Sequence, residues 1–375
     1  MRIGIDGLSV TPREGGFYRA FKQVIECCDD FPAEYEIIVF LSPDTYESLS
    51  VKHANIFFRV VNVPSRIRYW AAQLYFPFAE HKYKLDVIYS PISASPILSR
   101  AKKVCMVNDL SFLRNPEELT IGARLYWRHL YTHALRKCNK IGCISRATRN
   151  DMIDLLRFNG DYIDVIYYYY DGYLQQCIHS NDSAVLGKYG IKGHYLLYVG
   201  IIAPRKNVLA LIKAFHALSL KRYEFNLVIC GKKGWLDESI QTYIELYSLQ
   251  SRITFTGFVS NGELAVIYKN ASLLILPSFM EGFGYTLIEA MSFGVPAIGS
   301  NRGSIPEVID DALFLFDPMD VDSIVKSAEI VLDLKDSDQL LSKKIKQKVW
   351  KFSKTNTYRG LLRLLTEWKN TIEIL

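Results

Sequence analysis

Two glutamates, Glu281 and Glu289, lie on either side of a Gly-Phe-Gly turn at residues 282–284. Apolar runs at 272–278 and 295–300 flank them, and the whole pattern predicts a strand, a glycine loop, a short helix and a second strand. The free N–H groups that begin such a helix favour an anion in the loop. Glu289 is expected to lean toward the same loop, because helical side chains tilt toward the helix N-terminus. Two carboxylates beside an anion site suggest a ligand with hydroxyl groups next to phosphates, such as a nucleotide sugar.

The elements that position this loop follow from an alternation of short apolar, β-branched runs with longer amphipathic runs along all 375 residues. This alternation predicts parallel sheets with crossover helices, and the length indicates two doubly wound α/β domains. We expect an N-terminal domain over 1–185, a C-terminal domain over 190–352, and a last helix within 353–375 that packs back on the first domain. The predicted strands are 2–7, 36–41, 56–63, 87–90, 103–109, 140–145, 164–170, 194–200, 226–231, 252–259, 272–277, 295–300 and 312–316.

The composition is that of a folded protein, with 49% apolar and 22% charged residues. No apolar run approaches the roughly 18 residues needed to span a bilayer. Asp6 stands where a signal peptide would have its apolar core. The seven cysteines form no Cys-x-x-Cys pair, which favours buried free thiols and a cytoplasmic protein. The net charge of +6 is too mild to indicate a nucleic-acid partner.

A cation pair, Arg205 and Lys206, follows the predicted strand 194–200 and its terminal Gly200. Open α/β sheets bind ligands at the carboxyl ends of their strands, where this pair would neutralise a pyrophosphate. Arginine would act through its fork of donors and lysine as a point charge. The alternative is a pair of solvated surface charges. Val259 ends another strand at this edge, where the backbone either bonds a nucleotide base or belongs to a plain core strand.

Two other nucleotide sites do not match the sequence. Residues 231–235, Gly-Lys-Lys-Gly-Trp, lack the Gly-x-x-x-x-Gly-Lys-Ser/Thr spacing of a phosphate-binding loop, which excludes the corresponding class of ATPases. No predicted strand is followed by Gly-x-Gly-x-x-Gly, which argues against a dinucleotide-dependent dehydrogenase.

Taken in order, these segments resemble glycosyltransferase family 4, whose members are retaining enzymes with the GT-B fold. That fold consists of two Rossmann-like domains facing across a cleft. The resemblance covers nearly the whole chain and is strongest over residues 195–320. The matching segments are Tyr198-Val-Gly200, Arg205-Lys-Asn207, Leu227-Val-Ile-Cys-Gly231, Phe255-Thr-Gly257, Glu281-Gly-Phe-Gly284 with Glu289-Ala290, and Gly303-Ser-Ile-Pro-Glu307.

The resemblance implies a role for each matching residue. Glu281 would hold hydroxyl groups of the donor sugar, and Glu289 would hold the ribose. Arg205 and Lys206 would bind the diphosphate and stabilise the charge that develops on the departing nucleotide, with no metal required. The anion cradle would be completed around the loop and the start of the helix by Gly282, Phe283, Gly284, Thr286 and Leu287.

The first half carries the residues expected to serve the acceptor. Gly15 and Gly16 resemble a glycine pair that lets the backbone approach the donor phosphate and the acceptor; a plain turn is the alternative. Asn108 stands where similar proteins have a histidine, and asparagine takes no proton near neutral pH. Asp109 is expected to orient the acceptor or a sugar hydroxyl, unless it caps a turn.

Residues 124–149 contain seven cations and no acidic residue. This composition suggests a patch for anionic lipid headgroups or a lipid-diphosphate acceptor, and the alternative is a solvated helix with its aromatic residues packed inward. The cations are Arg124, Arg128, Arg136, Lys137, Lys140, Arg146 and Arg149, and the interleaved aromatic residues are Tyr126, Trp127 and Tyr131.

The function expected from this resemblance is retaining transfer of a hexosyl group from a UDP- or GDP-sugar to a glycan or lipid-linked acceptor. The setting would be assembly of a bacterial surface polysaccharide, such as O-antigen or lipopolysaccharide, at the cytoplasmic face of the inner membrane. The Asp-x-Asp pairs at 320–322 and 336–338 precede helical stretches, so capping is expected there and no metal site. The alternatives are a nucleotide-sugar epimerase and a non-catalytic scaffold that binds a nucleotide sugar or glycan.

Overall fold

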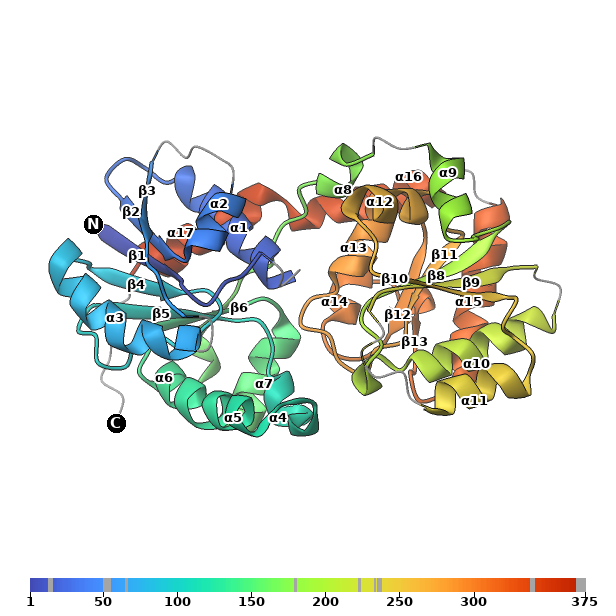
Figure 1. Ribbon diagram of the computed structural model, residues 1–375, viewed down its shortest axis with the longest axis horizontal. Coiled ribbons are helices and arrows are strands. Elements are labelled where there is room, and N and C mark those ends of the chain that lie inside the picture. Colours follow the sequence, from blue (N-terminus) through green and yellow to red (C-terminus); the bar gives the residue numbers. More distant parts are fainter. Residues whose placement is uncertain are drawn as a thin grey trace. The chain divides into compact units, whose positions relative to one another are not determined.

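The computed structural model describes residues 1–12, 16–49, 55–64, 67–178, 181–221, 224–232, 234, 238–337 and 341–368. The chain forms two compact units, one of Met1–Tyr169 with Phe352–Leu375 and one of Tyr170–Lys351 (Figure 1). The first unit therefore ends earlier than the predicted boundary at 185. The reason is that helices α8 (Tyr173–Gln176) and α9 (Asp182–Lys188) pack against α12 (Asn261–Lys269) of the second unit.

The described part of the first unit contains a seven-stranded parallel sheet with the order β3-β2-β1-β4-β5-β6-β7. Its strands are mostly buried, as a sheet covered on both faces requires, and this explains their nearly continuous apolar sequences. The strands are β1 (Arg2–Gly7), β2 (Glu36–Leu41), β3 (Ile56–Val60), β4 (Val87–Ser90), β5 (Lys102–Val107), β6 (Lys140–Cys143) and β7 (Ile163–Val165).

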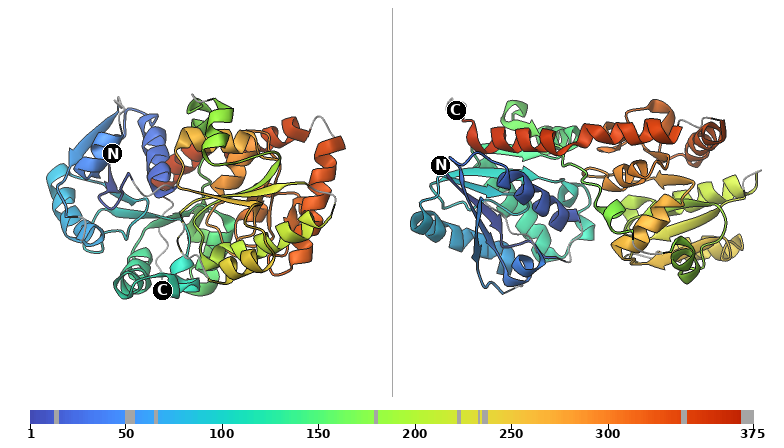
Figure 2. Two further views of the ribbon diagram at one scale, coloured as in Figure 1. Left: turned by 45° about the vertical axis from the view of Figure 1, so that its right-hand side comes forward. Right: turned by 90° about the horizontal axis from the view of Figure 1, so that it is seen from above.

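Helices cover both faces of this sheet. Figures 1 and 2 show α3, α5 and α6 on one face, and α1 beside α17, drawn in red, on the other. The last helix thus packs on the first unit, within the predicted range 353–375. The helices are α1 (Gly16–Asp29), α2 (Pro43–Ser48), α3 (Arg68–Tyr83), α4 (Ser111–Arg114), η2 (Pro116–Glu118), α5 (Ile121–Leu125), η3 (Tyr126–Tyr131), α6 (Thr132–Arg136), α7 (Arg146–Leu156), η4 (Gly160–Tyr162) and α17 (Lys354–Thr366).

The second unit repeats this plan with six parallel strands, among its described residues, in the order β10-β9-β8-β11-β12-β13. The strands are β8 (Tyr195–Val199), β9 (Asn226–Cys230), β10 (Ile253–Gly257), β11 (Leu273–Leu276), β12 (Ala297–Ser300) and β13 (Leu315–Phe316). The other helices are η5 (Pro204–Lys206), α10 (Val208–Ser219), α11 (Glu238–Leu246), α13 (Tyr285–Ser292), α14 (Ile305–Ile309), η6 (Ala312–Phe314), α15 (Val321–Ser337), α16 (Leu341–Lys348) and η7 (Val349–Phe352). Two parallel doubly wound sheets are the predicted fold class.

One carboxyl group is buried completely at the carboxyl end of β1. Asp6 accepts hydrogen bonds from the Ser93 hydroxyl at 2.5 Å and from the Leu8 backbone N–H at 3.1 Å. Burial disfavours the carboxylate and outweighs both hydrogen bonds, so that the pKa of Asp6 rises from 3.8 to about 6. Asp6 is therefore a pH-sensitive point in the core of the first unit.

Replacing Asp6 by asparagine is expected to change how stability depends on pH. Between about pH 4 and pH 6 the unfolded wild-type chain loses this proton before the folded chain does, so its stability falls as pH rises. Above about pH 6, the buried Asp6 carboxylate lowers the free energy of unfolding by about 3 kcal/mol. This value follows from the pKa difference between 3.8 and about 6. Urea denaturation at several pH values measures this effect. As pH rises through the range, the free energy of unfolding of Asp6→Asn should increase by about this amount relative to wild type. Asp161→Asn, at an exposed position, is the control and should show no such change. A constant difference across the range would contradict the raised pKa.

Candidate functional site

The predicted cation pair lies at the carboxyl end of β8. The chain leaves the sheet at Gly200 and turns through η5, which carries Arg205 and Lys206, before α10 begins. The Phe279 backbone N–H donates to the Arg205 carbonyl oxygen at 2.9 Å, which joins this turn to the loop after β11. Gly231, which follows β9 at φ +148°, must lack a side chain, because a Cβ there would lie 2.0 Å from the Gly200 carbonyl oxygen. The ends of β8, β9 and β11 therefore meet at one edge of the sheet.

Lys206 and Glu281 form an ion pair at this edge, with 2.5 Å between Lys206 Nζ and Glu281 Oε1. Both side chains are largely buried, with exposed fractions of 13% and 12%. The Ser278 hydroxyl donates to the same carboxylate at 2.7 Å, and the Ser304 hydroxyl donates to the Glu281 carbonyl oxygen at 3.0 Å. Glu281 is thus held by its side chain and by its backbone. Neither serine was predicted as a site residue, although Ser278 stands two residues after β11.

The charges around Glu281 keep its carboxylate ionised. Burial alone would raise its pKa, but the Lys206 ammonium, the Ser278 hydroxyl and Arg205 outweigh burial and hold the pKa of Glu281 below its usual value of 4.5. Glu281 is therefore a buried acceptor of hydrogen bonds at neutral pH. A ring of sugar hydroxyls supplies donors that match such a group.

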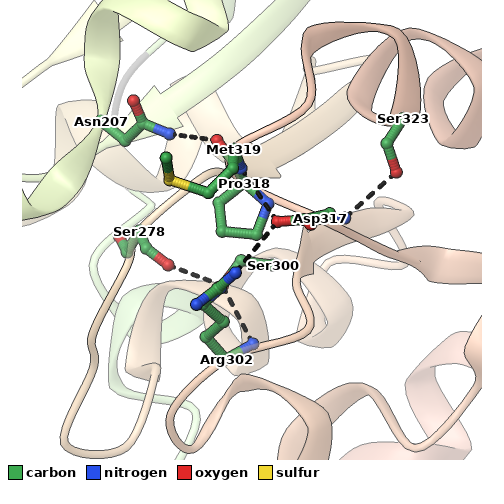
Figure 3. A network of polar contacts seen from close by, with 8 residues as sticks. All are labelled: Asn207, Ser278, Ser300, Arg302, Asp317, Pro318, Met319 and Ser323. Carbon is green, nitrogen blue, oxygen red and sulfur yellow. Dashed lines mark hydrogen bonds and ion pairs between the residues drawn. The ribbon is translucent and has the colours of Figure 1, made fainter.

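A polar network fixes the loops around this pair (Figure 3). Asn207, at φ +53° between η5 and α10, donates to the Pro318 carbonyl oxygen at 2.7 Å. Arg302 contacts Asp317 at 3.4 Å, and the Ser300 hydroxyl donates to the Ser278 carbonyl oxygen at 2.6 Å. The loops after β8, β11, β12 and β13 are thereby tied to one another, which restricts the positions of the cations and of Glu281.

Glu289 is also buried, with 3% exposed, but it has different partners. Tyr268 of α12 donates to Glu289 Oε2 at 2.7 Å, and Tyr173 of α8 donates to Glu289 Oε1 at 3.0 Å. Neither tyrosine was identified from the sequence, and no local signal marks them, because they come from helices far apart in the chain. A ligand hydroxyl that bonds Glu289 must share this carboxylate with two phenols.

The glycine loop 282–284 leads directly into α13, where the sequence predicts an anion-binding helix start. Gly284 precedes α13 at φ +98° and provides no side chain to cap the helix N–H groups. The side chains of Phe283 and Leu287 are buried, so any part they play in ligand binding comes from their backbone. The other predicted donor-binding positions belong to the same unit. Gly282 lies in the loop before α13, Thr286 in the first turn of α13, and Val259 two residues after β10.

The residues expected to serve the acceptor belong to the first unit. The Asn108 amide donates to the Pro91 carbonyl oxygen at 3.2 Å, and Asp109 Oδ1 accepts the Ser111 backbone N–H at 2.8 Å. Asp109 therefore caps the turn before α4, as its alternative interpretation predicts. Gly16 begins α1, whereas Gly15 lies outside the described residues.

Metal ligands do not gather in the described ranges, where no group of three or more His, Cys, Asp and Glu side chains has a suitable arrangement. Asp320 Oδ1 accepts the Asp322 backbone N–H at 2.9 Å before α15, which is the capping contact expected there. Asp338 lies outside the described residues. None of the described helices has the length and apolar character of a membrane span.

The chain is similar in sequence to bacterial sugar transferases. Residues 186–348 match the family model of glycosyl transferases group 1. O-antigen chain mannosyltransferase B of Escherichia coli is 32% identical over 267 residues, which are 69% of this chain and 68% of that protein. The serotype-specific mannosyltransferase WbdA of Escherichia coli is 30% identical over 287 residues, which are 72% of this chain but only 34% of WbdA.

The fold is shared with solved glycosyltransferase-like structures. Anabaena HepE in complex with UDP and glucose superposes with a TM-score of 0.72 and 17% identity, over 97% of this chain and 98% of HepE. At that identity the likeness concerns the fold alone. The family assignment rests on the sequence similarity, and the two parallel α/β sheets are consistent with it. The chain belongs to the group 1 glycosyltransferases, and the proteins similar to it include an O-antigen chain mannosyltransferase.

Proposed function

We propose that this glycosyltransferase moves a hexosyl group from a GDP- or UDP-sugar to a glycan or lipid-linked acceptor, with retention of anomeric configuration. The observation that carries the proposal is the buried ion pair of Lys206 and Glu281 beside Arg205, at the carboxyl edge of the second sheet. A diphosphate needs cations, and the attached sugar needs acceptors for its hydroxyl groups. Both are present there, on loops that are joined to one another by hydrogen bonds.

Each residue then has a distinct role in donor binding. Glu281 accepts hydrogen bonds from hydroxyls of the transferred sugar, because its carboxylate stays ionised. Arg205 and Lys206 face the diphosphate, together with the N–H groups that begin α13. Glu289 holds the ribose, whose hydroxyls share the carboxylate with Tyr173 and Tyr268.

We propose that no divalent metal takes part. The two cations and the N-terminus of α13 supply positive charge where the leaving diphosphate gains negative charge. The nearby Asp320 is engaged in capping α15.

We propose that the leaving phosphate itself accepts the proton of the acceptor hydroxyl. Asn108 accepts no proton near neutral pH, and Asp109 is engaged with the Ser111 N–H. The leaving phosphate oxygen takes the proton of the acceptor hydroxyl as the new glycosidic bond forms on the face from which the phosphate departs. This front-face course requires no protein base and retains the anomeric configuration.

The biological setting is proposed from the relatives. One of them is an O-antigen chain mannosyltransferase, so we propose that this enzyme builds a bacterial surface polysaccharide on the cytoplasmic side of the membrane. The relatives are named mannosyltransferases, which makes a mannosyl donor the first to test.

A panel of GDP- and UDP-sugars is expected to contain at least one that raises the melting temperature. A donor at one hundred times its dissociation constant adds about 2.7 kcal/mol to the free energy of unfolding. Free mannose and glucose serve as controls and should give no shift. Nucleotide release with an acceptor, and the anomeric configuration of the product by NMR, then test transfer and retention. A panel without any shift would contradict the donor site; binding without release would indicate a scaffold, and conversion of the donor alone an epimerase.

A further inference from the structure

Helix α3 exposes a stripe of large apolar side chains in the first unit. Trp70, Leu74 and Phe78 follow one another at intervals of four residues and are 52%, 77% and 59% exposed. The opposite side of the helix is buried against the sheet through Ala72, Phe76 and Ala79. Helix α3 is therefore apolar on two sides. One side is covered by the sheet, and the other faces outward.

A second helix with exposed apolar side chains lies next to α3. Ile121 and Leu125 of α5, again four residues apart, are 76% and 55% exposed. The rings of Trp70 and Tyr126 meet edge to face at 5.8 Å, so α3 adjoins the helical segment that continues α5. We call Trp70, Leu74, Phe78, Ile121 and Leu125 the α3–α5 face.

The segments that carry the α3–α5 face, residues 67–83 and 116–137, contain six Arg and Lys residues and three acidic residues, Glu80, Glu117 and Glu118. Arg128 and Lys137 are exposed there. Lys82, exposed near the end of α3, lies 5.8 Å from the Phe78 ring. Glu80, the acidic residue of α3, accepts the backbone N–H groups of Arg100 and Ala101. Exposed apolar side chains with an excess of positive charge nearby match the chemistry of an anionic surface.

The structure changes which residues would contact such a surface. Tyr126 and Tyr131, predicted aromatic anchors, are 5% and 2% exposed and belong to the core, and Trp127 packs against the same cluster. Arg124, Arg136 and Arg149 donate to the carbonyl oxygens of Pro116, Leu156 and Gly160. The apolar contacts must come from α3 and from the first turn of α5.

We propose that the α3–α5 face docks on an anionic lipid bilayer. Tryptophan, phenylalanine and leucine enter the headgroup boundary, while Lys82, Arg128 and Lys137 attract anionic headgroups; this composition is typical of interfacial helices. Each cation near such a surface favours binding independently of the apolar contacts. The inference goes beyond sugar transfer, because it concerns where the enzyme works and not its chemistry.

Sedimentation with vesicles tests the proposal. Wild type should bind phosphatidylcholine vesicles that contain phosphatidylglycerol, bind pure phosphatidylcholine vesicles less, and dissociate as salt is added. Leu74→Gln with Phe78→Gln should weaken binding by at least about tenfold, through loss of apolar contact. Arg128→Gln should weaken it by about fivefold. Matched controls are Leu246→Gln, 70% exposed on α11, and Lys326→Gln, exposed on α15; neither should change binding.

Three outcomes would overturn the proposal: no protein in the pellet at low salt, wild-type binding by the Leu74/Phe78 variant, or lipid-independent self-association that the same variant abolishes. The last, measured by light scattering, would assign the face to contacts between copies. Donor-induced melting shifts of the same variants should equal those of wild type. Failure of the donor panel would therefore refute the transfer proposal and leave vesicle binding unaffected.

Discussion

Replacing Arg205 by alanine should lower kcat/KM for glycosyl transfer by about a hundred- to a thousandfold, the usual loss when one group that stabilises developing charge is removed. Arg205 lies in the η5 turn, and its charge reaches Glu281, whose pKa it helps to lower. In the proposed donor site, its guanidinium offers parallel donors to a diphosphate. Nucleotide release measures the effect, with the donor found by the GDP- and UDP-sugar panel and an acceptor that supports transfer.

Two further variants make this test specific. Arg205→Lys keeps the charge but loses the fork of donors, so its rate should fall between those of wild type and Arg205→Ala. Lys326→Ala removes an exposed cation of α15 and should leave the rate unchanged. If Arg205→Ala transfers sugar at the wild-type rate, the diphosphate is held by other groups and the assigned role is wrong.

Replacing Lys206 by methionine should destabilise the second unit by about 3–5 kcal/mol at neutral pH, because the buried Glu281 carboxylate loses its cation. In wild type, the lowered pKa of Glu281 contributes stability that is present above pH 4.5 and is lost as pH falls through the lower folded pKa. In Lys206→Met burial dominates, so stability should instead fall as pH rises above 4.5. Urea denaturation from acidic to neutral pH measures this reversal.

The double variant Lys206→Met/Glu281→Gln separates folding from catalysis. A neutral pair leaves no buried charge, so most of the lost stability should return, while transfer stays abolished. Glu281→Gln alone keeps the Lys206 charge and serves as the matched control. A double variant as unstable as Lys206→Met would show that packing around Lys206, and not the charge of Glu281, causes the loss.

The sheets were predictable because their strands carry their own signal. Buried parallel strands are continuous apolar runs, and β1, β2 and β4 begin and end at the predicted residues. Strand ends were less certain: the run 56–63 forms a strand only to Val60, and residues 312–314 form a helical turn before β13. The β-strand propensity of these residues continues beyond the ends of the strands. Pairing with the neighbouring strand decides where each strand ends.

Part of the site was predictable for a similar reason. Arg205, Lys206 and Glu281 follow strands of one parallel sheet, and the rule that such ends share an edge brings them together. The partners of Glu289 were not predictable, because Tyr173 and Tyr268 reach it only through the packing of α8, α12 and α13. The outward stripe of α3 was also missed, since a helix that is apolar all round has no amphipathic pattern to reveal an exposed side.

The placement of α17 has a consequence for biosynthesis. The second unit is one uninterrupted segment, Tyr170–Lys351, whereas the first needs the last helix, whose Leu361, Leu364 and Leu365 are buried completely. A ribosome delivers that helix after the whole second unit, so the first unit waits with an uncovered apolar surface while the second can already fold. The first unit is therefore completed only when α17 emerges, and a nascent chain stalled before residue 352 would be a substrate for chaperones.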